Sequence, residues 1–223
     1  MLRKILMSLF FVCLSLFVAS GQGWVKLVGS SGHNVTYGTF GAGKLSADFS
    51  FADCFQVRGA ARLVSFPGMT VDARPSYFHD FAFGRIKAEA LLSYRYQHTT
   101  SDVAAGFGAG LQMKWFWLDL GYYYRVLCPK NGSPMSDPFN LYYELGFSCL
   151  PDCERWDLFA VVSNSRLAEL ERLHYPSLIV EALYYPVENL GVVFGCECSR
   201  SGMFHLSGSH RQCCMKLGVQ YSW

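Results

Sequence analysis

The sequence predicts an all-β protein, a single closed antiparallel transmembrane β-barrel of about twelve strands, with ten strands as the alternative. Three observations lead to this prediction. Apolar and polar residues alternate along most of the chain, as successive side chains of a strand do. Of the 223 residues, 51% are hydrophobic and only 16% are charged, whereas about a quarter of the residues in soluble domains are charged. The chain also begins with a segment typical of export signals.

The first 21 residues are predicted to be a signal peptide, which leaves residues 22–223 as one barrel domain. Arg3 and Lys4 supply a charged start, and residues 5–18 are uncharged and almost wholly apolar. Residues 19–21 are small, as a signal peptidase requires, so we expect the mature chain to begin at Gln22. Because the apolar run is shorter than the roughly 20 residues that span a bilayer as a helix, cleavage is favoured over a retained anchor.

Composition limits the classes of function that the chain can have. Without Arg3 and Lys4, basic and acidic residues are equal in number. A balanced charge gives no long-range attraction for polyanions, so we expect no nucleic-acid partner. The high apolar content also excludes a disordered or acidic solvating segment.

Period-two segments occur from the start of the mature chain to its end. The clearest is the last strand, in which Met215, Leu217, Val219, Tyr221 and Trp223 alternate with polar or small residues. Each such segment has one apolar and one polar face. We therefore predict strands near 23–31, 35–51, 55–66, 70–78, 82–98, 102–114, 117–127, 138–149, 155–165, 176–186, 190–200 and 208–223. The first and fourth are the weakest, and merging each with a neighbour gives the ten-stranded alternative.

The apolar faces can point either into a dry core or toward lipid. Two features favour lipid: the polar faces mix full charges with glycine and alanine, which suits a crowded lumen, and aromatic residues gather near strand ends, as in the girdles of membrane barrels. These aromatics are Tyr94, Tyr96, Trp115-Phe116-Trp117, Tyr221 and Trp223. Leu120, Phe107 and Val219 are then expected to face lipid.

The final strand carries a resemblance to known proteins. An aromatic last residue, Trp223, preceded by apolar residues at every second position, resembles the assembly signal of Gram-negative outer-membrane β-barrel proteins. The resemblance covers the whole chain at the level of architecture and identifies no particular family. It implies a location in the cell outer membrane, contact with outer-membrane lipids and lipopolysaccharide, and recognition by the barrel-assembly machinery through the strand ending at Trp223.

The predicted connections agree with this topology. If both ends of the chain lie in the periplasm, the three longest connections, 128–137, 166–175 and 201–207, all lie outside, where such barrels have their long loops. Ser165 followed by residues 166–173 has the pattern of a short Ser-capped helix in one of these outer loops.

Charged residues on the polar faces are the first candidate functional site. We expect the lumen to contain Arg58, Arg62, Arg85, Lys87, Glu89, Arg95, Asp119, Arg125, Glu144 and Glu181, together with Lys114. Opposite charges in a narrow lumen are expected to pair, because an unpaired buried charge loses hydration without compensation. The protein is then a non-enzymatic barrel, either a structural component filled by salt bridges or a narrow solute pore with opposing charged walls.

A histidine cluster at the outer rim is the second candidate. Pairing of the first and last strands would bring His33 near His205 and His210. Histidine and serine at this rim give the alternative of a lipid- or lipopolysaccharide-modifying hydrolase. We assign no catalytic residue, metal or cofactor from the sequence. A third alternative is a surface binding or adhesion module that uses the outer loops.

Eight cysteines follow the signal segment, and exported proteins usually pair them. Cys149 and Cys153 flank a turn and are a candidate disulfide. Cys198 is expected to lie opposite Cys213 on the lipid-facing side of adjacent strands. The spacing of these cysteines does not suit a tetrahedral zinc site, because Cys213 and Cys214 point to opposite faces.

Overall fold

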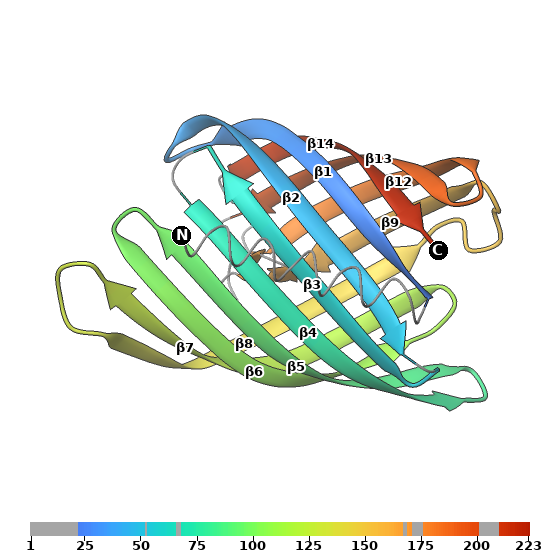
Figure 1. The fold of residues 1–223 in the computed structure, drawn as a ribbon, viewed down its shortest axis with the longest axis horizontal. Helices are drawn as coiled ribbons and strands as arrows, with labels where there is room; N and C mark the ends of the chain where they lie inside the picture. The colour runs from blue at the N-terminus through green and yellow to red at the C-terminus, as the bar shows by residue number, and fades with distance from the viewer. Residues whose placement is uncertain (1–21, 52, 66–67, 167–168, 171–175, 201–209) are drawn as a thin grey trace.

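The computed structural model describes residues 22–51, 53–65, 68–166, 169–170, 176–200 and 210–223, and within them twelve strands form one closed antiparallel barrel (Figure 1). The predicted fold is therefore confirmed, with twelve strands and not ten. The barrel strands are β1 (Gln22–Asn34), β2 (Gly38–Phe51), β3 (Phe55–Val64), β4 (Gly68–Phe81), β5 (Gly84–Gln97), β6 (Thr100–Gln112), β7 (Phe116–Pro129), β8 (Met135–Ser148), β9 (Trp156–Ser163), β12 (Ser177–Val187), β13 (Leu190–Arg200) and β14 (His210–Ser222).

The barrel closes where the first and last strands pair. β1 and β14 are in continuous antiparallel register from Trp24 opposite Ser222 to Asn34 opposite Gln212. Beyond this ladder, Gly23 and Trp223 exchange two backbone hydrogen bonds, of 3.3 and 3.0 Å. Closure leaves every barrel strand paired on both sides, so no edge of this sheet is left to aggregate or to face lipid unpaired.

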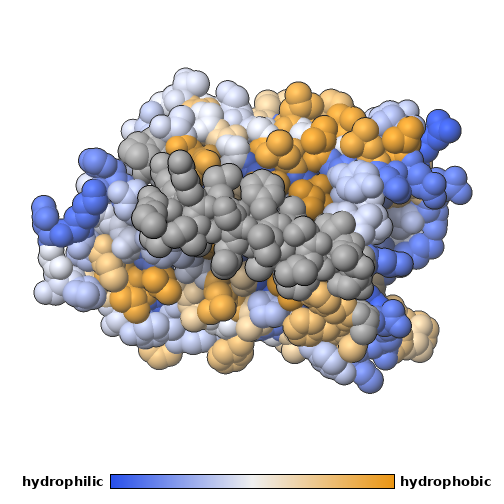
Figure 2. Space-filling model, in the orientation of Figure 1, coloured by the Kyte–Doolittle hydropathy of each residue, from blue (hydrophilic) through white to orange (hydrophobic). Residues whose placement is uncertain are grey.

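Burial alternates along the strands, with apolar side chains outside and polar ones inside. On the outer surface Phe107, Leu120 and Val219 are 68%, 53% and 49% exposed, whereas Asp119, next to Leu120, is 6% exposed. Figure 2 shows hydrophobic side chains gathered over the outer wall. A soluble protein does not expose so much contiguous apolar surface, so this orientation is that of a barrel in lipid.

Aromatic rings hold the end of the chain against its neighbours. The Trp223 ring stacks on Tyr221 with centroids 6.3 Å apart and contacts the Phe49 ring at 5.9 Å. The connection between β7 and β8, residues 130–134, lies at the opposite end of the barrel from Trp223 (Figure 1). Within the described residues, no helix is long and apolar enough to cross a membrane.

The helix predicted after Ser165 is wrong where the structure describes that segment. Ser165–Arg166 forms β10, which pairs with β11 (Glu169–Leu170) in a separate two-stranded sheet. Ser165 is fully buried, and its backbone oxygen and hydroxyl accept hydrogen bonds from Arg74 on β4. These tertiary contacts outweigh the local capping pattern, since helix propensity is a weak preference.

Candidate functional site

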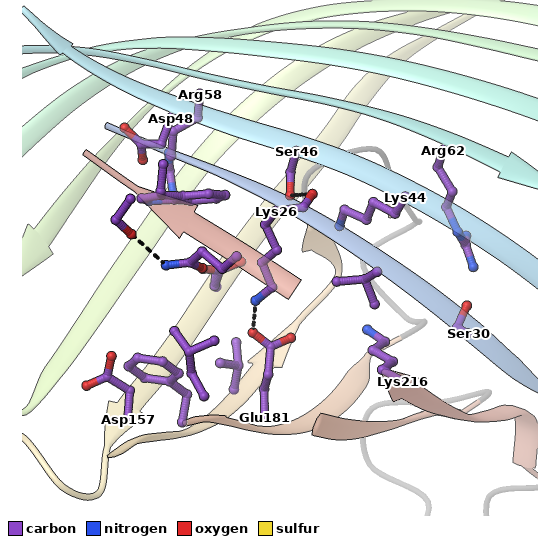
Figure 3. Close-up of a pocket in the computed structure, with 18 of the residues that line it drawn as sticks. Lys26, Ser30, Lys44, Ser46, Asp48, Arg58, Arg62, Asp157, Glu181 and Lys216 are labelled. Atoms are coloured by element: carbon purple, nitrogen blue, oxygen red, sulfur yellow. Dashed lines mark hydrogen bonds and ion pairs between the residues drawn. The ribbon is translucent and has the colours of Figure 1, made fainter. Parts of the chain in front are cut away.

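The interior of the barrel has a filled side and an open side. Ion pairs and buried rings from β4 to β8 occupy the filled side. On the open side is a cavity of about 500 Å³, shown in Figure 3. Its lining comes from β1, β2, β3, β9, β12 and β14, with smaller contributions from β4, β7 and β8. The polar faces of the strands therefore line a space large enough for a small solute.

Glu89 is the centre of the filled side. Its side chain is 1% exposed and lies 3.1 Å from the Arg58 guanidinium and 3.0 Å from the Lys87 ammonium. The Tyr142 hydroxyl donates a hydrogen bond of 2.9 Å to the same carboxylate. Lys87 also donates to Asp119 at 2.5 Å. One charged cluster thus joins strands β3, β5, β7 and β8. Each buried charge in it has a partner of opposite sign, which it needs because burial removes its hydration.

Glycines on the inward face make room for the Tyr142 ring. A Cβ added at Gly121 would lie 2.2 Å from the ring carbon Cζ, and one added at Gly108 would lie 2.0 Å from the hydroxyl. Any larger residue at either position would displace the ring. Tyr142 packs in a buried cluster with Leu91, Ala104 and Tyr123. The glycines on these strands therefore have a packing role.

Arg74 ties β4 to the segment that follows β9. Its guanidinium donates to the Ser165 backbone oxygen at 3.1 Å and to the Ser165 hydroxyl at 3.0 Å. It also pairs with Asp72 at 3.2 Å, and its charged group lies 5.9 Å from the centre of the Tyr142 ring. Since four strands separate β4 from β9 in the sheet, this contact crosses the lumen and narrows it.

A second contact across the lumen lies within the open side. The Lys26 ammonium on β1 forms an ion pair with the Glu181 carboxylate on β12, two barrel positions beyond the seam partner β14. In Figure 3, Lys44, Arg62 and Lys216 lie on one side of this pair. On the other side lies Asp157, whose carboxylate accepts a hydrogen bond of 3.1 Å from Tyr185. The Lys26–Glu181 pair therefore stands in the middle of the cavity.

Trp117 faces the cavity, which corrects its predicted place in an outer aromatic girdle. Its indole N–H donates to Glu144 at 2.9 Å, and its ring meets Phe159 edge-on at 6.0 Å. A Cβ added at Gly146 would lie 2.1 Å from the Trp117 ring, so the glycine lets the indole lie against β8. Trp115 is 58% exposed, as the girdle prediction requires.

The residues predicted for the lumen occupy four regions. Arg62, Glu144 and Glu181 line the cavity with Arg58, and Lys87, Glu89 and Asp119 are in the filled side. Toward the other end of β5 and β7, Asp102 lies 2.7 Å from Arg125 and 3.9 Å from Arg95. Two predicted residues lie at the ends of strands, where Arg85 pairs with Asp80 and Lys114 pairs with Asp152, both at 2.5 Å with largely exposed side chains.

Several cavity and lumen residues were not predicted. Lys26 shares the inward face of β1 with Trp24 and Val28, two residues away on either side, so the period of two could have predicted its inward position. Arg74 lies opposite Arg58 and Lys44 lies opposite Arg62 on β3, so each shares the inward face of a predicted lumen residue. The alternation could not predict which inward residues contact one another across the barrel.

The histidine cluster stays a prediction. His33 on β1 is exposed and lies opposite Cys213 of β14. His205 lies outside the described residues, and for His210 only the backbone, paired with Arg200, is described. In the part of the chain that the structure describes, no three histidine, cysteine or acidic side chains are placed to hold a metal ion. Cys149 and Cys153 are exposed free thiols in the structure, so their disulfide also stays a prediction.

Comparison with known proteins gives likeness in structure alone. No family model matches the sequence, and no curated protein matches it. The fold is similar to a solved structure described as "KdgM porin", with a TM-score of 0.53 and 13% identity over 90% of this chain and 99% of that one. It is also similar to the translocator domain of the autotransporter NalP from Neisseria meningitidis, with a TM-score of 0.56 and 11% identity over 99% and 97% of the two chains.

A third similar structure is the COG4313 outer membrane channel from Pseudomonas putida F1, with a TM-score of 0.56 and 9% identity over 92% and 96% of the two chains. In all three comparisons the aligned region covers nearly the whole length of the solved structure. At these identities the likeness concerns the fold. The chain therefore has the architecture of outer-membrane β-barrels.

Proposed function

We propose that the protein is an outer-membrane channel with a narrow path for small polar solutes along the open side of its lumen. The cavity of about 500 Å³, enclosed by a barrel with an apolar outer surface, is the observation that supports this function most strongly. Its wall carries lysine, arginine, aspartate and glutamate side chains, which suit hydrated and polar solutes. Outer-membrane channels and porins among the structures of similar fold support the same proposal.

We further propose a route by which the protein reaches its membrane. Residues 1–21 act as a cleaved export signal. The strand ending at Trp223 then directs assembly into the outer membrane, where the exposed apolar band meets lipid. No described feature favours the lipid hydrolase over the channel, since His33 points away from the cavity lining.

Electrical recording tests the channel directly. Purified protein refolded into a planar bilayer is expected to give discrete current steps, small in size because the filled side and the two contacts across the lumen leave a narrow path. A bilayer that contains folded protein, shown by heat-modifiable gel mobility, and yet stays sealed would contradict the proposal.

The ion pair in the cavity gives a variant with a defined effect. Replacing both Lys26 and Glu181 with alanine removes two long side chains from the middle of the path without changing the net charge. We expect the single-channel conductance to rise by a factor of about two, because the conductance of a narrow pore is set by its constriction. The measurement is the step size in the same salt solution.

The matched control removes another lysine–carboxylate pair. Lys114, between β6 and β7, and Asp152, between β8 and β9, pair at 2.5 Å with side chains 58% and 69% exposed. Their double alanine variant is expected to conduct like the unmodified protein. Equal conductance of all three proteins would show that the path does not pass Lys26 and Glu181.

A further inference from the structure

Two cysteines face each other on the outer surface, close to the ends of β13 and β14. The register places Cys198 directly opposite Cys213, three residues after β14 begins at His210. Both belong to the outward-facing set of their strands, as do Phe194 and Met215, which are 46% and 70% exposed. The same face is therefore shared by both thiols.

The geometry of this pair suits a covalent bond. The two sulfur atoms lie 2.6 Å apart. Directly opposed residues of antiparallel strands have their Cα atoms about 4.5–5.5 Å apart, within the range of Cα separations found across disulfides. The neighbouring cysteines of the same two strands are placed differently: Cys196 lies opposite Met215, and Cys214 lies opposite Glu197.

We propose that Cys198 and Cys213 form a disulfide that joins β13 to β14 in the exported protein. The two thiols lose two protons and two electrons, and one sulfur–sulfur bond forms. The oxidant is a dithiol oxidoreductase in its disulfide form, which accepts the electrons and protons and becomes a dithiol. Export compartments support this exchange.

The bond would strengthen the part of the barrel next to its closure. β14 pairs with β13 on one side and with β1 on the other. The disulfide would close the loop between residues 198 and 213 covalently, which restricts the unfolded chain. It would therefore hold the beginning of β14 in register while the seam with β1 forms.

Peptide mapping tests the proposal on the unmodified, full-length protein. The protein is purified without reductant, its free thiols are blocked with N-ethylmaleimide, and it is digested with trypsin. We expect a linked pair of peptides, 173–200 and 212–216, which separate after reduction. Each peptide contains a second cysteine, so fragment spectra must place the bond at Cys198 and Cys213. Recovery of these two residues with the blocking group attached would overturn the proposal.

Serine variants provide an independent check. Cys196→Ser and Cys214→Ser are expected to keep the linked peptides, whereas Cys198→Ser and Cys213→Ser are expected to lose them. Reduction should also lower the temperature at which the compact gel band of the unmodified protein disappears, and Cys198→Ser should no longer respond to reductant. A linked pair that persists in Cys198→Ser would place the bond elsewhere and overturn the assignment. None of these readouts depends on channel activity.

Discussion

Replacing Glu89 with alanine is expected to destabilise the barrel by about 3–5 kcal/mol, the usual cost of removing one partner from a buried ion pair. The carboxylate is 1% exposed and accepts from Arg58, Lys87 and the Tyr142 hydroxyl. Without it, two cations and a hydroxyl lose their shared acceptor in a space that water enters poorly. The free energy of unfolding in detergent micelles or lipid vesicles, from urea titration, measures the loss.

Two further variants separate the charge of Glu89 from its hydrogen bonds. Glu89→Gln keeps an acceptor for Tyr142 and is expected to lose less stability than Glu89→Ala. The control is Asp80→Ala at the end of β4, which breaks the Asp80–Arg85 pair, whose side chains are 61% and 41% exposed. Water solvates both groups there, so no measurable change is expected. Equal losses at Glu89 and Asp80 would refute the central role given to Glu89.

Replacing Arg74 with methionine is expected to have the second largest effect, on stability and on conductance together. Methionine keeps much of the side-chain volume but removes the guanidinium that Asp72 and Ser165 share. We expect a loss of about 3 kcal/mol, because the group is 4% exposed and removing one partner of a buried pair is costly. Release of Ser165 from β4 should also raise the single-channel conductance.

Arg95 offers a matched control for Arg74. It is also an inward arginine, but its carboxylate neighbour Asp102 lies 3.9 Å away and has a closer partner in Arg125 at 2.7 Å. Arg95→Met is therefore expected to cost clearly less stability than Arg74→Met. Arg74→Lys should behave as an intermediate, since an ammonium cannot hold the Ser165 oxygen and hydroxyl in the planar geometry of a guanidinium. A conductance in Arg74→Met equal to that of the unmodified protein would contradict a narrowing role for this contact.

The sequence predicted the barrel well because the decisive signal is local. Alternation with a period of two fixes which side chains share a face, so the inward placement of Asp119 and the outward placement of Leu120 follow from adjacent residues. Strand number was also predictable, because turn residues separate the alternating segments. The structure shifts the predicted ends by a few residues, as with β4, which begins at Gly68 and ends at Phe81.

Contacts across the lumen were not predictable in the same way. Lys26 meets Glu181, and Arg74 meets Ser165, because the barrel brings together faces that are far apart in the sequence. Trp117 was assigned to the outer girdle because it follows Trp115 and Phe116, although its parity with Asp119 places it inside. In that case the aromatic cluster was given more weight than the alternation.

The orientation of the barrel toward lipid is tested most directly by nitroxide labels in lipid vesicles. In a variant without other cysteines, single cysteines would replace Leu120 and Val219 on the apolar surface and Ser30 in the cavity lining. Molecular oxygen concentrates in the bilayer, whereas a charged nickel chelate stays in water. We expect oxygen, and not the nickel chelate, to speed the relaxation of the labels at positions 120 and 219, and the nickel chelate to speed the relaxation of the label at position 30. If the nickel chelate speeds the relaxation of the labels at 120 and 219 but not of the label at 30, the apolar face does not meet lipid and the proposed orientation is contradicted.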